Sequence, residues 1–210
     1  MIESPVMDAR IVAVDVGSIA PPSRFAWAAL DAPGKDIVAR GSDPDTAASA
    51  LLAGLRAERK AALLLESPLA VPVPTVVEDG WRLLGKARHG EGNRPWSAGA
   101  GAGVLATGLA QGAWMLARLA AVDPGLLVTT QFGEWSQGGA QLLLAEAYVS
   151  GLGKPVPLPA GQDAADAAAA GLALVRFLGQ ADPGPRQSRE VSGLIGVGVD
   201  APVWVVAGRA

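Results

Sequence analysis

The sequence contains no cysteine and only one histidine. Without cysteine, disulfides and thiolate metal sites are excluded, and the cysteine count indicates no redox compartment. Any bound metal ion must therefore take oxygen ligands. The single histidine, His89, is a weak candidate for proton transfer beside a metal, because a lone exposed histidine more often has no catalytic role.

Aromatic residues make up only 5% of the chain and charged residues 18%, whereas half of the 210 residues are apolar. The apolar residues are mainly Ala, Val and Leu, so we expect helices and strands to pack closely through small side chains. The length predicts a single domain over residues 1–210 with a substantial core. The net charge is −3, so nucleic acid binding would require a local basic patch.

The chain shows no clear targeting or membrane signal. The first residues lack the basic start and apolar core of a signal peptide, so secretion is not expected. Residues 97–117 carry no charge, but their Gly and Ala content, with Thr107 and Gln111, favours a buried helix over a membrane span. We expect a cytoplasmic protein without a membrane partner. A homodimer is compatible with the sequence, although no motif argues for it.

Turn signals and apolar runs predict the order of elements in the first third of the chain. Short strands separated by Pro/Gly turns favour antiparallel pairing, and the segment 42–45 is typical of a helix start. A continuous apolar run after that helix predicts a buried strand that returns parallel to its neighbours. The predicted elements are strands at residues 10–16, 25–31 and 36–40, a helix at 46–60 and a strand at 61–66.

The second part of the chain is predicted to hold two further helices and one buried strand. An irregular insertion over about 67–97 precedes a long apolar helix over 97–122, which Asp123-Pro124-Gly125 ends. A buried strand follows at 141–149 and a helix at 163–178. Residues 191–207 predict a C-terminal hairpin or an edge strand.

Acidic residues occur in or beside these apolar elements, where an unpaired ionised group is costly to bury. Asp15 lies in the first strand, and Glu66 ends the fourth. Asp163 and Asp166 begin the last helix and, being three residues apart, lie on one face. If the strands of Asp15 and Glu66 are neighbours, their side chains meet at one edge of the sheet. The spacing therefore predicts one shared acidic site.

Three or four carboxylates within a few ångströms need a cation to remain ionised, and Mg²⁺ or Mn²⁺ matches oxygen ligands. Two such ions about 3.5–4 Å apart can activate a water and stabilise the leaving oxygen of a phosphodiester. Structural roles stay open for each acid. Asp163 and Asp166 suit a helix N-terminus through the helix dipole, Asp15 could cap a turn, and Glu66 could form an ion pair.

The order βββα, Asp15 in Val-Asp-Val-Gly, Glu66 in Leu-Glu-Ser-Pro and the Asp163–Asp166 helix together resemble the ribonuclease H-like superfamily. The helix motif is similar to that of RuvC-type Holliday junction resolvases. The layout from residue 66 to residue 166 looks like the DUF429 family of predicted RNase H-like nucleases. Glu146, on the penultimate strand, resembles a further acid of that family.

This resemblance implies an α/β fold with a mixed five-stranded sheet and helices on both faces. Its first three strands would be antiparallel, and the fourth and fifth parallel. The resemblance also implies metal binding by four matching acids, with Glu146 as an additional candidate ligand. The four acids that match the metal-binding residues of the family are Asp15, Glu66, Asp163 and Asp166.

Basic and aromatic residues of the insertion form the predicted phosphate-binding and base-stacking surface, and a solvated loop is the alternative. The residues of this surface are Lys86, Arg88, Arg94 and Trp96. Four other tryptophans lie in apolar contexts and are expected in the core. They are Trp27, Trp114, Trp135 and Trp204.

The function predicted from these features is a divalent-metal-dependent phosphodiester hydrolase acting on nucleic acid. One alternative is a non-catalytic scaffold or regulatory protein of the same fold, which the lack of a strongly basic composition favours. A second alternative is phosphate chemistry of the actin-like ATPase or sugar kinase type, because residues 15–18 also match the phosphate-binding start of those enzymes. They clamp ATP between two such domains, however, and 210 residues hold only one.

Overall fold

The structure is a computed structural model that describes residues 8–18, 24–32, 34, 36–57, 59–69, 85, 98–150, 161–178 and 203–207. For residues 148–150, 177 and 203–207 it describes the backbone alone. The elements are β1 (Ala9–Asp15), β2 (Ala26–Ala32), β3 (Ile37–Gly41), α1 (Pro44–Arg56), β4 (Lys60–Leu65), α2 (Gly99–Val122), β5 (Val128–Thr129), α3 (Phe132–Ser136), β6 (Leu142–Ser150), α4 (Gln162–Leu178) and β7 (Val203–Ala207).

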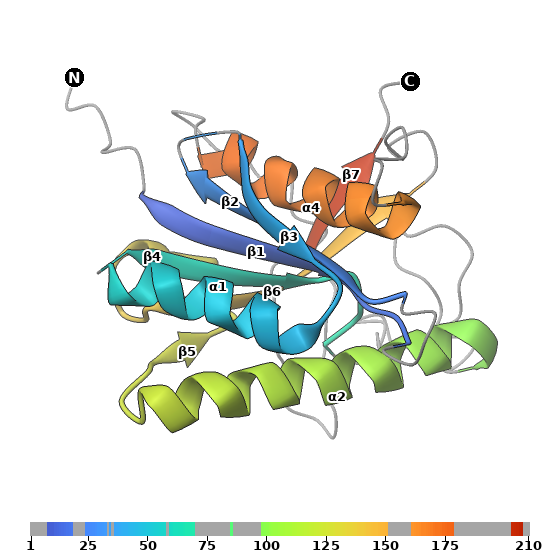
Figure 1. The fold of residues 1–210 in the computed structure, drawn as a ribbon, viewed down its shortest axis with the longest axis horizontal. Helices are drawn as coiled ribbons and strands as arrows, with labels where there is room; N and C mark the ends of the chain where they lie inside the picture. Colours follow the sequence, from blue (N-terminus) through green and yellow to red (C-terminus); the bar gives the residue numbers. More distant parts are fainter. Residues whose placement is uncertain are drawn as a thin grey trace, which may run out of the picture.

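One mixed sheet joins all of these strands, in the order β3-β2-β1-β4-β6-β5 (Figure 1). β1, β2 and β3 pair antiparallel, whereas β4 pairs parallel with both β1 and β6. β5 and β7 both run parallel to β6, on the edge that faces away from β4. The expected α/β class and mixed sheet are confirmed. The expected count of five strands was wrong, because two short strands extend the edge at β6.

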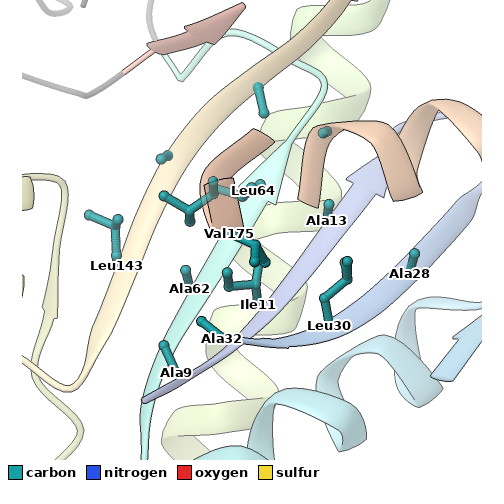
Figure 2. Close-up of a cluster of buried hydrophobic side chains, with 14 of the residues drawn as sticks. Ala9, Ile11, Ala13, Ala28, Leu30, Ala32, Ala62, Leu64, Leu143 and Val175 are labelled. Atoms are coloured by element: carbon teal, nitrogen blue, oxygen red, sulfur yellow. The ribbon is translucent and has the colours of Figure 1, made fainter. Parts of the chain in front are cut away.

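The central strands are buried on both faces, which explains their continuous apolar sequences. Along β1, Ile11 and Ala13 belong to a core beneath α4, while Val12 and Val14 belong to a second core beneath α1 and α2. Figure 2 shows the first of these cores, where Leu64 of β4 and Val175 of α4 lie near Ile11. α4 covers one face of the sheet, and α1 and α2 cover the other (Figure 1).

The first helix begins at Pro44, within the predicted helix-start signal at 42–45 and two residues before the predicted first helical residue, Thr46. Asp43 has an extended backbone and accepts a hydrogen bond from Thr46 N at 2.9 Å, and Pro44 follows at the start of the helix. The predicted end at residue 60 was wrong, because α1 ends at Arg56 and Lys60 already pairs with Ala9 in the sheet. Sheet pairing therefore ends the helix one turn earlier than its composition suggests.

α2 is much more exposed than the buried helix expected from its sequence. It contacts α1 and the sheet through one stripe that includes Gly108, Gly112 and Met115. Its outer face includes Leu109 and Trp114, which are 37% and 43% exposed, so the prediction that Trp114 lies in the core was wrong. Among the described residues, α2 alone is long and apolar enough to cross a membrane. Core helices of soluble proteins can have the same length and composition.

The other expected features fall partly outside the described residues. Trp27 and Trp135 are buried, as expected, but the side chain of Trp204 lies outside the described part. β7 is an edge strand parallel to β6, so the edge-strand alternative is confirmed for residues 203–207. The remainder of the expected C-terminal hairpin and nearly all of the insertion at 67–97 lie outside the described residues.

Candidate functional site

The register of β1 and β4 brings Asp15 and Glu66 side by side at the carboxyl ends of these two strands. Ala13 pairs with Leu64 and Val14 with Leu65, and the next residue, Glu66, donates its N–H to Val14 O at 2.8 Å. Side chains alternate along a strand, so Asp15 shares the face of Ala13, and Glu66 shares the face of Leu64. Ala13 and Leu64 both belong to the core beneath α4. The two carboxylates therefore leave the sheet on the face that α4 covers.

α4 supplies the third carboxylate because its small residues allow a close approach to the sheet. Ala167 and Ala170 are buried against β1 and β2. At Gly171, an added Cβ would lie only 2.3 Å from Leu30 Cδ1, so a larger residue there would require the buried Leu30 side chain to shift. Asp166, one turn before Ala170, is 3% exposed. The alanine-rich sequence of α4 thus positions an acid against the carboxyl ends of β1 and β4.

The three side chains meet in one cluster, here called the carboxylate triad. Asp15, Glu66 and Asp166 each offer one oxygen, and these oxygens all lie within 4.8 Å of one another. Oxygens bound to one Mg²⁺ at 2.0–2.1 Å lie at most about 4.2 Å apart, so small side-chain shifts would close the triad around an ion. Its oxygen donors match a hard divalent cation. The triad could therefore bind a metal ion.

Two glutamine side chains hold the triad residues and the adjoining loop in place. Gln162 Nε2 donates to Asp166 Oδ1 at 2.6 Å across one helical turn. Gln111 Nε2 of α2 donates to Gly17 O at 2.6 Å, just after Asp15. An added Cβ at Gly17 would lie 2.4 Å from Arg24 O, so only glycine fits there. These contacts reduce the freedom of the acids before any ligand binds.

The triad opens into a cavity of about 580 Å³ between the start of α4 and the first half of α2. α4 and α2 lie on opposite faces of the sheet (Figure 1), so the cavity lies at the carboxyl ends of β1 and β4. Within the described part of the chain, Arg24 is the one cationic side chain that lines it. The lining residues used below are Asp15, Glu66, Asp163, Asp166, Arg24, Gly103 and Thr107.

Asp163 and Glu146, also predicted as ligands, lie outside the triad. Asp163 lines the same cavity and faces Arg24, with 4.0 Å between its Oδ2 and Arg24 Nε. Glu146 is fully buried in β6, and its Oε1 accepts a hydrogen bond from Leu69 N at 2.6 Å. Glu146 therefore holds the segment that follows Glu66. Metal ligation by these two residues stays a prediction.

The predicted nucleic-acid contacts Lys86, Arg88, Arg94 and Trp96 lie outside the described residues, as does His89. Sequence reasoning missed Arg24, Gln111 and Gln162 as parts of the site. Gln162 could have been found, since it precedes Asp166 by one helical turn. Arg24 could not, because its place depends on a loop closed by the hydrogen bond from Arg24 N to Ser18 O at 2.8 Å.

Comparisons of the chain with protein-family models, with curated proteins and with solved structures found no significant match. The resemblance to ribonuclease H-like nucleases therefore stays a prediction. Any function of this chain has to be argued from the site itself, whose defining feature is the carboxylate triad in an open cavity.

Proposed function

We propose that this protein is a phosphodiester hydrolase that acts on nucleic acid with Mg²⁺ or Mn²⁺ as its cofactor. The proposal rests on the convergence of Asp15, Glu66 and Asp166 at the carboxyl ends of two adjacent parallel strands, facing a cavity. Ligand sites of α/β sheets commonly occupy this edge. The donor set also agrees with the absence of cysteine and the near absence of histidine.

The charge of the described cavity lining favours a bound cation. Four acids line it, and among the described residues Arg24 is the only cation facing them. A phosphate ester would be repelled by this surface unless bound metal offset the negative charge. When bound, Mg²⁺ or Mn²⁺ supplies an activated water and stabilises negative charge on phosphate oxygens.

The side chains of the cavity have separable roles in this proposal. The triad holds the cation, and Gln162 orients Asp166 through the 2.6 Å hydrogen bond to Oδ1. Gln111 keeps the loop after Asp15 against α2. Arg24 lines the cavity with a side chain that is 76% exposed, so in this proposal its guanidinium contacts a phosphate oxygen of the substrate.

The direct test is an assay of Mn²⁺-dependent cleavage on branched DNA, duplex DNA and RNA–DNA hybrids. We expect wild-type protein to cleave at least one of these substrates and Asp15→Asn to lower kcat at least about 100-fold, because a metal ligand is lost. The matched control is Asp36→Asn in the exposed turn before β3, at the opposite end of the sheet. Activity that survives Asp15→Asn would contradict the proposal. Metal binding without cleavage of any substrate would favour the non-catalytic alternative.

A further inference from the structure

A second cavity adjoins the first and shares a wall with it. It has a volume of about 320 Å³, and Asp163 lines both cavities. The residues that line the second cavity are Phe25, Ala26, Arg40, Gly41, Ser42, Asp163 and Ala164. These residues come from the start of β2, the end of β3 and the start of α4. A ligand that leaves the triad past Asp163 therefore enters a second, separate space.

Among the described residues, one arginine lines each cavity. Arg24 lines the triad cavity, and Arg40, an exposed residue of β3, lines the second one. Within the described part of the chain, Arg40 forms no ion pair, so its guanidinium is available for an anionic ligand. Arg24 faces Asp163 at 4.0 Å, which offsets the negative charge of the shared wall.

The end of β3, next to Arg40, is closely packed against β2. Gly41 pairs with Trp27 in the sheet, and an added Cβ there would lie 2.7 Å from Trp27 Nε1. Trp27 Nε1 in turn donates to Thr46 Oγ1 at 3.1 Å, which ties the start of β2 to the first turn of α1. The segment that carries Arg40 is therefore supported by an ordered part of the fold.

We infer that the second cavity is a subsite for a phosphate group that neighbours the reacting phosphodiester of the substrate, with Arg40 as its ligand. The inference rests on the proposed function and narrows it. The substrate is a strand whose phosphates occupy both cavities, one at the triad and the next beside Arg40. Arginine suits this role because its planar guanidinium forms paired hydrogen bonds to phosphate oxygens.

The test compares three dinucleotides as substrates in Mn²⁺, one unmodified, one with a 5′-terminal phosphate and one with a 3′-terminal phosphate. We expect one terminal phosphate to raise kcat/KM at least about tenfold over the unmodified dinucleotide, as a charge-assisted contact would. In Arg40→Gln, the ratio of kcat/KM with the terminal phosphate to kcat/KM without it should fall to about one. The matched control is Arg56→Gln, an exposed arginine at the far end of α1, which should keep the ratio.

The outcomes separate the subsite from the proposed function. If the unmodified dinucleotide is cleaved but neither terminal phosphate raises kcat/KM, the subsite is wrong and the hydrolase stands. The same conclusion follows if a terminal phosphate still raises kcat/KM in Arg40→Gln. If neither these dinucleotides nor the longer substrates are cleaved in Mn²⁺, the proposed function fails, and the subsite fails with it.

Discussion

At the residue scale, the ionisation of Asp31 makes the stability of the folded sheet depend on pH. It pairs across the strands with Arg10, whose Nε lies 2.6 Å from Asp31 Oδ1, and Arg59 NH1 lies 2.9 Å from the same oxygen. Burial opposes ionisation of Asp31, but the hydrogen bonds and charges of Arg10 and Arg59 outweigh it and lower its pKa. The ionised form is therefore favoured by folding.

We predict that Asp31→Asn lowers the free energy of unfolding by about 1–3 kcal/mol at pH 7, because two arginines lose their carboxylate. A lowered pKa in the folded state gives stability that is complete above the unfolded pKa, near 4, and lost as the pH falls through the folded value. The gap between variant and wild type should therefore be constant above about pH 5 and shrink below about pH 4. Urea unfolding at several pH values measures it. A gap that is unchanged at pH 3 would rule out this assignment, and Asp36→Asn serves as the control.

At the scale of elements, the contact between α2 and the segment after β4 determines how near α2 lies to the triad. Ser67 is fully buried, and its hydroxyl donates to Val104 O at 3.2 Å. Gly108 lies directly against it, and an added Cβ at Gly108 would be 2.0 Å from Ser67 Oγ. Gly103, on the same helix, has no atom within 4 Å of its own added Cβ.

These two glycines should respond to alanine in opposite directions. Gly108→Ala should destabilise the protein by about 1–3 kcal/mol, because Ser67 cannot move without losing its hydrogen bond. Gly103→Ala should stabilise it by up to about 1 kcal/mol, because alanine favours the helix and no clash occurs. Thermal or urea unfolding of both variants measures the difference. A shift of the same sign in both would show that α2 does not pack as described.

Local sequence signals predicted where helices and strands lie better than they predicted how exposed or how paired those elements are. The cap at Asp43 depends on residues within one turn, so the start of α1 could be read from the sequence. The exposure of α2 could not, because its many small residues fit a buried helix and an exposed one equally well. β5 was missed because it has only two residues, Val128 and Thr129, and depends entirely on pairing with β6.

The same limit applies to the site. Asp15 and Glu66 could be matched because both follow apolar runs and parallel neighbours end at one edge of the sheet. The contact between Gln111 and Gly17 joins residues 94 positions apart, and no local pattern predicts it. The second cavity, with Arg40 in its wall, likewise requires the packing of three elements.

At the scale of the whole molecule, the triad joins three elements that are distant in sequence. Its residues come from β1, the end of β4 and α4, and without a counter-charge their carboxylates repel one another. A cation that binds only the folded protein should therefore stabilise the entire domain.

We predict that Mn²⁺ at about 100 times its Kd raises the free energy of unfolding by about 2.7 kcal/mol. For a domain of this size, that corresponds to a rise in Tm of roughly 5–10 °C. Asp166→Asn should show little of this rise, whereas the Asp36→Asn control should show all of it. Scanning calorimetry with and without Mn²⁺ measures both. An equal rise in Asp166→Asn would place the stabilising ion elsewhere.

The most direct test of the carboxylate triad is a calorimetric titration of Mn²⁺ into wild-type, Asp166→Asn and Asp163→Asn proteins. An asparagine side chain keeps an oxygen that can accept the hydrogen bond from Gln162, so Asp166→Asn removes charge with little change of shape. We predict saturable binding to wild type, affinity at least about tenfold weaker in Asp166→Asn, and a smaller loss in Asp163→Asn, since Asp163 lies outside the triad. No binding to wild type, or equal affinity in Asp166→Asn, would contradict the assignment of the triad as a metal site.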